Sequence, residues 1–319
     1  MAVKTIAAHA DRPTPALYLA LAGDLLVAAA KFAGGAVTGS SALFSEGIHS
    51  SVDAMSEVLL LYGLRAARRP PTREHQLGFG REVFFWNFIV ALSILALGAG
   101  AALLDGMHQI VYPSPVGSSW ISYGVLLVAL LAEIPAMTSA IRSVQAKREV
   151  GFVHYVRYSR DPTMLTVLFG GFSSILGLGI AALGTALSSV LRAPIWDGAA
   201  SVLIATILAV TALFLAATSK KLLIGVPAAP AMVASILKVT SDHPDVQTAN
   251  GTVSVHLAPD QVLVALSVAF RPGLTTDDIE LAVAAIDRAV RAAHPSVVVF
   301  LLKPQSGAQF QALQASRGW

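Results

Sequence analysis

Six long apolar runs between Pro15 and Thr218 restrict the possible folds of this chain more than any other feature. Each run reaches the ~20 residues that a helix needs to cross a hydrocarbon core about 30 Å thick. The chain of 319 residues is 55% hydrophobic and only 13% charged, whereas about 25% of the residues of soluble domains are charged. We therefore predict an all-α bundle of six transmembrane helices at residues 15–37, 41–64, 83–111, 120–144, 164–191 and 195–217.

Basic residues are concentrated in the connections on one side of these helices. Five arginines follow the second run, four basic residues follow the fourth, and Lys220 and Lys221 follow the sixth, whereas the opposite connections contain only Arg192. Because Lys and Arg are retained on the cytoplasmic side, we predict cytoplasmic N- and C-termini in a bacterial-type inner (plasma) membrane. Residues 1–14 are then a cytoplasmic segment, expected to contain no removable signal peptide. The net charge of +3 comes from these flanks and does not indicate nucleic acid binding.

The sequence pattern changes at residue 222, after a transmembrane domain of residues 15–221. Segments 230–240 and 275–293 have helical periodicity, and segments 252–257, 262–270 and 297–302 alternate as strands do. Asp277 and Asp278 fall in the first turn of the second helix, where acidic residues are favourable. Residues 222–304 are therefore predicted to form an α+β domain, whereas the tail 305–319 shows no clear pattern and is expected to be mobile.

The second apolar run carries four ionisable residues on one helical stripe. Glu46, His49, Asp53 and Glu57 follow one another at intervals of three, four and four residues. An ionisable side chain inside the bilayer costs several kcal/mol, so it requires a partner or a function. An imidazole and a carboxylate one turn apart form half of a site suited to zinc or a similar divalent ion, completed from another helix. The alternative is an internal hydrogen-bond network that fixes the packing of the helices. For the central pair, His49 and Asp53, we favour a functional site over such a network. For Glu46 and Glu57 neither interpretation is favoured.

Four further acids lie inside other runs; Asp105 and Asp197 are close to the outer ends of the third and sixth runs and are expected to be solvated, whereas Asp24 and Glu133 lie deeper. Asp24, in the first run, lies at a depth comparable with Asp53 and either faces the same site or pairs with Lys31, seven residues further on. Glu133, in the fourth run, precedes Pro135 and could bond backbone groups that the proline frees.

Several kinds of chemistry are excluded by the residue types present. The chain has no cysteine, so thiolate metal sites, disulfides and thiol catalysis are absent. No nucleophile with its base, phosphate loop or redox motif occurs, and we predict that the protein is not an enzyme and needs no cofactor. His243, His256 and His294 are dispersed, which is more typical of surface or capping residues than of metal ligands.

Four stretches of the sequence resemble the cation diffusion facilitator family. They are TGSSALFSEGIHSSVD at 38–53, HQLGFGREVFFW at 75–86, RDPTMLTVLF at 160–169 and KKLLIG at 220–225. The resemblance implies a homodimer of six-helix bundles with cytoplasmic ferredoxin-like domains, which exports zinc, manganese, iron or cobalt. It also implies that His49 and Asp53 are the second-helix half of the transport site, and that His75 lies in a loop where some members bind a further ion.

The fifth helix departs from the pattern of this family. Its members with a similar fifth-helix segment continue with an acidic pair, where this chain has Gly170 and Gly171. A site of one His and one Asp leaves a divalent ion short of ligands. Asp24 or Glu57 could supply the missing carboxylate, or the ion could keep waters.

Two functions follow from these observations. The first is a secondary transporter that exports divalent cations, such as zinc, in exchange for protons, with His49 as a proton carrier. The alternative is a transport-inactive membrane scaffold or regulator of the same fold, which the two glycines favour and the retained acidic stripe opposes. On either reading the bilayer surrounds the helices, and the C-terminal domain serves dimerisation.

Overall fold

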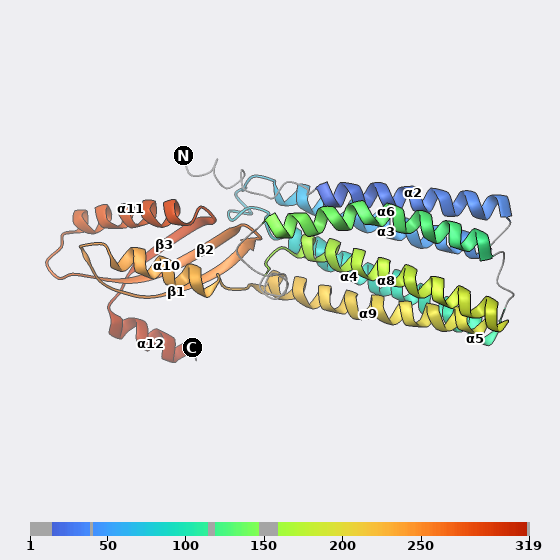
Figure 1. The fold of residues 1–319 in the computed structure, drawn as a ribbon. Helices are drawn as coiled ribbons and strands as arrows, with labels where there is room; N and C mark the ends of the chain where they lie inside the picture. The colour runs from blue at the N-terminus through green and yellow to red at the C-terminus, as the bar shows by residue number, and fades with distance from the viewer. Residues whose placement is uncertain (1–14, 39–40, 114–118, 147–158, 318–319) are drawn as a thin grey trace. The chain divides into compact units, whose positions relative to one another are not determined.

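The computed structural model describes residues 15–38, 41–113, 119–146 and 159–317 of the chain (Figure 1). These residues divide into two compact units. A helical unit comprises residues 15–66 and 82–220, and a second unit comprises the loop 67–81 together with residues 221–317. Each unit is described by itself below.

Long helices running alongside one another make up the helical unit (Figure 1). They are α2 (Pro15–Thr38), α3 (Ser41–Ala67), α6 (Ser119–Ala146), α8 (Pro162–Leu191), α9 (Ile195–Ile224) and a further 30-residue helix. That further helix is built from α4 (Glu82–Ser93), the π-helical turn η1 (Ile94–Ala99) and α5 (Gly100–Val111). Every predicted apolar run is thus a helix, with ends that differ from the prediction by a few residues.

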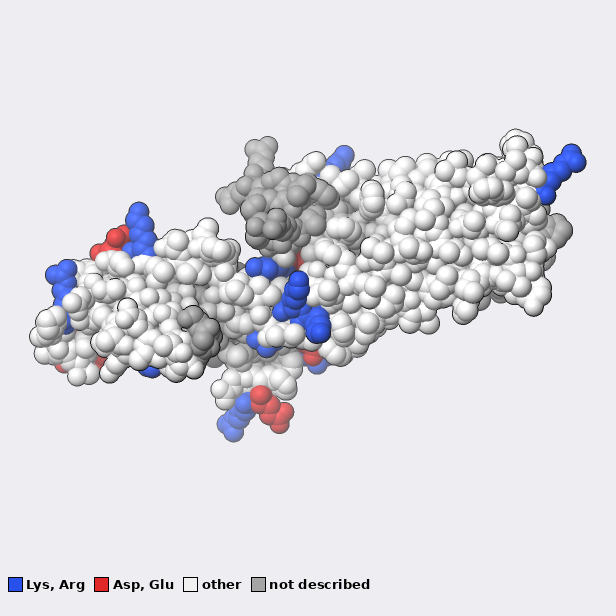
Figure 2. Space-filling view, turned by 90° about the horizontal axis from the view of Figure 1, so that it is seen from below, with Lys and Arg blue, Asp and Glu red and all other residues white. Residues whose placement is uncertain are grey.

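Four helices in the described part of the chain are long and apolar enough to cross a membrane, namely Glu82–Val111, Tyr123–Gln145, Pro162–Leu191 and Ile195–Ile224. On the face drawn in Figure 2, the long stretch of the helical unit between its two ends shows no Lys, Arg, Asp or Glu. An uncharged belt of this kind is what a hydrocarbon environment requires, because exposed charges there are costly.

Small residues allow these helices to approach closely. A Cβ atom added to Gly184 of α8 would lie 2.5 Å from the Cβ of Ala200 on α9. A Cβ added to Gly106 of α5 would lie 2.9 Å from the carbonyl oxygen of Gly198, also on α9. Glycine at both positions lets the neighbouring backbones meet, as small residues do in membrane helix packing.

The second unit contains a three-stranded sheet in the order β1-β2-β3. Its elements follow the chain as α10 (Pro230–Ser241), β1 (Val246–Ala258), β2 (Gln261–Phe270), α11 (Thr276–Ala293), β3 (Val297–Pro304) and α12 (Gly307–Arg317). Strands β1 and β2 are antiparallel and are joined by a short turn, whereas β2 and β3 are parallel and are connected through α11. The predicted α+β composition of this region is therefore what the structure contains.

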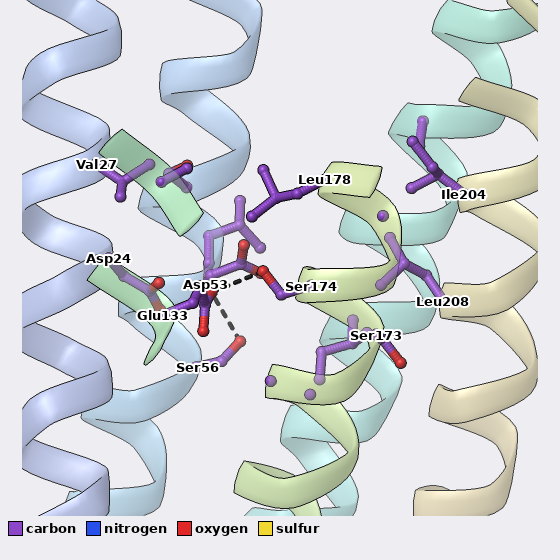
Figure 3. A pocket seen from close by; sticks show the side chains of 18 of the residues that line it. Asp24, Val27, Asp53, Ser56, Glu133, Ser173, Ser174, Leu178, Ile204 and Leu208 are labelled. Atoms are coloured by element: carbon purple, nitrogen blue, oxygen red, sulfur yellow. Dashed lines mark hydrogen bonds between the residues drawn. The ribbon is translucent and has the colours of Figure 1, made fainter. Parts of the chain in front are cut away.

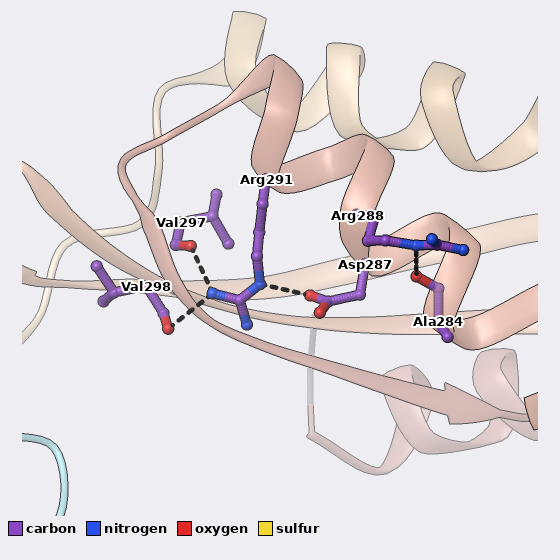
Figure 4. A network of polar contacts seen from close by, with 6 residues as sticks. All are labelled: Ala284, Asp287, Arg288, Arg291, Val297 and Val298. Carbon is purple, nitrogen blue, oxygen red and sulfur yellow. Dashed lines mark hydrogen bonds and ion pairs between the residues drawn. The ribbon is translucent and has the colours of Figure 1, made fainter. Parts of the chain in front are cut away.

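The core of the second unit lies between one face of the sheet and the helices α10 and α11. Alternate residues of β2, from Val262 to Val268, are buried there together with Ile236 of α10 and Ile286 of α11, as the two-residue repeat of a strand requires. Figure 4 shows how the end of α11 is attached to β3: the guanidinium of Arg291 donates to the carbonyl oxygens of Val297 (3.2 Å) and Val298 (3.1 Å) and to Asp287 (2.7 Å).

Two sequence-based expectations for this unit were wrong. Strand β1 begins at Val246, six residues before the predicted start, and the segment 307–317, expected to be mobile, forms the helix α12. The reason is a contact that hydropathy does not reveal. The ring of Phe310 on α12 lies over Gly251 of β1, where an added Cβ would be 2.6 Å from the phenyl Cζ. Asn250 also donates to the carbonyl oxygen of Gln305, just before α12 (2.8 Å).

A capping box at the start of α11 gives a first prediction. The Thr275 hydroxyl accepts from the backbone N–H of Asp278, and the Asp278 carboxylate accepts from the hydroxyl (2.6 Å) and the backbone N–H (2.9 Å) of Thr275. We expect Thr275→Ala to lower the free energy of unfolding by about 1 kcal/mol, the usual loss for a threonine N-cap. Thermal unfolding of the full chain in detergent measures it.

The same box predicts a pH dependence. The hydroxyl and backbone hydrogen bonds of Thr275 lower the pKa of Asp278, so their stabilisation is present above the ordinary carboxyl pKa and is lost as the pH falls through the lowered value. Thr275→Ser keeps the hydroxyl and serves as the control. A Thr275→Ala protein as stable as the Ser variant at pH 7 would contradict the prediction.

Candidate cation site

A cavity of about 310 Å³ lies inside the helical unit. Residues from α2, α3, α6, α8, α9 and the Glu82–Val111 helix line it (Figure 3). Most of its wall is apolar or small, and its ionisable residues are Asp24, Lys31, Asp53, Glu57, Asp105 and Glu133. Among the described helices, the cavity therefore gathers acids from four: α2, α3, α6 and, through Asp105, the Glu82–Val111 helix.

Three of the predicted site residues meet at this cavity. A hydrogen bond joins the side chains of Asp24 on α2 and Glu57 on α3. Asp53, one turn before Glu57, is close enough to interact electrostatically with both. Two carboxyl groups form such a bond only when one of them carries a proton. The other oxygen of Glu57, Oε2, is buried without a hydrogen-bond partner.

Glu133 also faces the cavity, from α6 (Figure 3). Its Oε1 accepts a hydrogen bond of 2.6 Å from the hydroxyl of Ser174 on α8. The expectation that Glu133 could bond backbone groups freed by Pro135 is thus replaced by a contact between two helices. Asp53 lies within electrostatic range of Glu133, which connects the α6 acid to the acids of α2 and α3.

Lys31 places a positive charge beside these acids. Its side chain is buried, its Nζ donates to the hydroxyl of Ser50 on α3 (2.9 Å), and it interacts electrostatically with Asp24 and Glu133. Asp24 therefore lines the cavity, as one of the two alternatives has it, and Lys31 lies within electrostatic range of it.

The remaining predicted site residues are not brought to the cavity in the described structure. The side chains of Glu46 and His49 lie outside the described residues. His75 is exposed in the loop 67–81 of the second unit, where its ring stacks on Phe79 with a centroid separation of 4.5 Å. In the described part of the chain, no group of three or more His, Asp or Glu side chains is close enough to hold a metal ion.

A buried polar clamp fixes α8 next to this cavity. The side-chain amide of Asn87 on α4 donates to Thr163 (2.9 Å) and accepts from the hydroxyl of Thr166 (3.1 Å), both on α8. Thr166 itself lines the cavity, one turn before Gly170. The clamp therefore sets the rotation of α8, and with it the direction in which Gly170, Gly171 and Ser174 face.

Sequence reasoning did not place Glu133 and Asn87 in the site, and it considered Lys31 only as a partner of Asp24. That partnership rested on the seven-residue spacing of Lys31 and Asp24, which puts both on one face of α2. Glu133 and Asn87 make their contacts to other helices, and no spacing within one helix indicates such partners.

The helices that line the cavity match a known family. Residues 17–224 match the family model described as the cation efflux transmembrane domain. That range is more than half of the chain and contains the whole cavity, so this integral membrane protein belongs to the cation diffusion facilitator family, as the resemblance predicted.

Individual relatives are similar over most of this chain. The "Proton-coupled zinc antiporter SLC30A9, mitochondrial" of Xenopus laevis is 28% identical over 275 residues, which are 83% of this chain and 49% of the relative. "Metal tolerance protein C4" of Arabidopsis thaliana is 30% identical over 226 residues, 70% of this chain and 50% of the relative. The "Manganese efflux system protein MneP" of Bacillus subtilis is 28% identical over 116 residues, 36% of this chain and 37% of the relative. The chain thus spans about half the length of the first two.

The polar clamp gives a prediction about stability. Asn87→Ala leaves the buried hydroxyl of Thr163 without its donor, and we expect the free energy of unfolding to fall by about 1–3 kcal/mol. Thermal unfolding of the full chain in detergent is the measurement. Thr206→Ala is the matched control, because that exposed hydroxyl donates to Val202 of its own helix (2.9 Å). Equal losses in the two variants would show that Asn87 does not hold α8.

Proposed function

We propose that this protein is a secondary transporter that exports a divalent metal cation, and that the cavity of the helical unit is its binding site. The observation that carries the proposal is the gathering of Asp24, Asp53, Glu57 and Glu133 around one cavity inside a bundle of apolar helices. Acids at this depth are costly unless they act on a cation or a proton. Membership of the cation diffusion facilitator family favours the cation.

Zinc is the cation that we propose as the substrate. The relative that covers 83% of this chain is named a zinc antiporter, and His49 with Asp53 would offer the nitrogen and oxygen ligands that zinc accepts. A relative with a shorter match is named for manganese, and a site richer in carboxylates would shift the preference toward such oxygen-seeking ions. Asp24 and Glu57 would complete the ligands that Gly170 and Gly171 do not provide.

Proton antiport is the coupling that we propose. The Xenopus laevis relative is named as proton-coupled. In this chain a hydrogen bond between Asp24 and Glu57 would require a proton, and a cation that bound both carboxylates would have to displace it. Cation entry and proton release would then occur at the same groups.

We also propose an arrangement in the membrane. The six long helices cross a bacterial-type inner membrane with both termini in the cytoplasm, where Lys and Arg of the connections are retained. The three-stranded unit, with α10 and α11 on one face of its sheet, is a cytoplasmic ferredoxin-like domain through which two copies of the chain form a homodimer.

A transport assay tests this function. Full-length protein in liposomes with a pH gradient should accumulate zinc, detected by a fluorescent indicator, and Asp53→Asn should reduce the initial rate at least tenfold because one anionic ligand is lost. Manganese and cobalt tested in parallel would identify the preferred cation. An equal zinc flux through the parent and Asp53→Asn would contradict the proposed site.

A transport-inactive scaffold is the second candidate function, and Lys31 is the observation that favours it. A buried ammonium near Asp24 and Glu133 already neutralises part of the acidic charge and would repel a divalent cation. Together with the two glycines of α8, it could make the cavity a closed structural network.

Substitution of Lys31 separates the two functions. In a transporter, Lys31→Met should raise the affinity for zinc roughly tenfold, because a charge that repels the ion is removed at short range. Calorimetric titration in detergent measures this affinity, with Lys31→Arg as the control that keeps the charge. Absence of zinc binding in the parent and in both variants would favour the scaffold.

A further inference from the structure

Helix α8 forms one wall of the cavity without any ionisable residue of its own. Between Pro162 and Leu191 it contains no Asp, Glu, His, Lys or Arg, and Gly170 and Gly171 face the cavity. We propose that Glu133 of α6 is the cation ligand on this side of the cavity, and that Ser174 of α8 is the positioning residue that holds it. This inference rests on the proposed transport function and adds a ligand from a helix that the sequence did not implicate.

The first argument is the orientation of Glu133. Its Oε1 accepts from Ser174 at 2.6 Å, a short bond of the kind that a carboxylate forms with a hydroxyl. Ser174 also lines the cavity, and Figure 3 shows the pair beside Asp53. Ser174 thereby holds the carboxylate of Glu133 at the wall of the cavity.

The second argument is the space left by Gly171. A Cβ atom built on Gly171 would lie 3.9 Å from Oε2 of Glu133 and 3.1 Å from the terminal methyl carbon of Met137. The carboxylate of Glu133 thus borders the volume that a side chain from position 171 would fill. Glu133 on α6 thus places a carboxylate in the part of the cavity where α8 has no ionisable side chain.

The third argument is the electrostatic surroundings. Asp53 on α3 and Glu133 on α6 repel each other, and a divalent cation between them would relieve this repulsion. Glu57 contributes a buried oxygen, Oε2, without a hydrogen-bond partner. Carboxylate oxygens from α3 and α6 would therefore bind the cation together, whereas Lys31 only partly balances them.

The inference is tested by removing the carboxylate and then restoring it from α8. We expect Glu133→Gln to weaken zinc and manganese binding at least tenfold in calorimetric titration of the full chain in detergent, and Ser174→Ala to weaken it less. The double variant Glu133→Gln with Gly171→Asp should recover most of the affinity, since the introduced carboxylate would need only the flexible end of Met137 to move.

Two controls make the outcome interpretable. Glu82→Gln changes a carboxylate of the same helical unit that accepts from the indole of Trp86 (2.8 Å) and does not line the cavity, so it should leave metal affinity unchanged. If Gly171→Asp prevents folding, Gly170→Asp replaces it, because an added Cβ at Gly170 has no atom within 4 Å. Thermal unfolding of each variant verifies that it is folded.

The results distinguish this inference from the function on which it rests. Unchanged affinity in Glu133→Gln, with binding in the parent and loss in Asp53→Asn, would overturn the role of Glu133 and leave the transport site intact. Failure of both folded double variants to recover any affinity would overturn the replacement of an α8 carboxylate by Glu133. A parent that neither binds nor transports a cation would overturn both proposals.

Discussion

The cost of placing ionisable groups in a hydrocarbon environment is the constraint on which the helical unit depends. A membrane helix can keep such a group only by giving it a partner, a proton or an ion. The described helices meet this requirement by bringing Asp24, Lys31, Asp53, Glu57 and Glu133 from three helices to a single cavity. The middle of the helical unit shows no charged residue on the face seen in Figure 2. The cost of exposed charge therefore explains both the uncharged surface and the gathering of ionisable residues at the cavity.

Prediction from sequence succeeded where length and hydropathy determine the outcome. Every predicted apolar run is a helix, since about 20 apolar residues suffice to define one in a membrane. It failed where one tertiary contact decides the structure. Helix α12 has few apolar residues, and it is ordered by Phe310 against Gly251 and by the bond from Asn250 to Gln305. Neither contact leaves a periodic signal in the segment itself.

The candidate site was predictable within one helix but not between helices. The spacing of Asp53 and Glu57 predicts that both lie on one stripe of α3, and the position of Asp24 along its run predicts a similar depth in the membrane. In the structure all three residues line the same cavity. The partnership of Glu133 with Ser174 depends on the rotation of α6 and α8 about their axes. The Asn87 clamp sets the rotation of α8 through hydrogen bonds to Thr163 and Thr166, and hydropathy carries no information about such bonds.

The charge balance of the cavity depends on both Lys31 and Glu133. The acids that line it are Asp24, Asp53, Glu57, Asp105 and Glu133, and Lys31 is the basic residue among them. Lys31 lies within electrostatic range of Asp24 and Glu133, so it offsets part of the negative charge that a cation would need. On the proposed function, Glu133 restores charge that Lys31 offsets, because α6 adds a carboxylate where α8 has none.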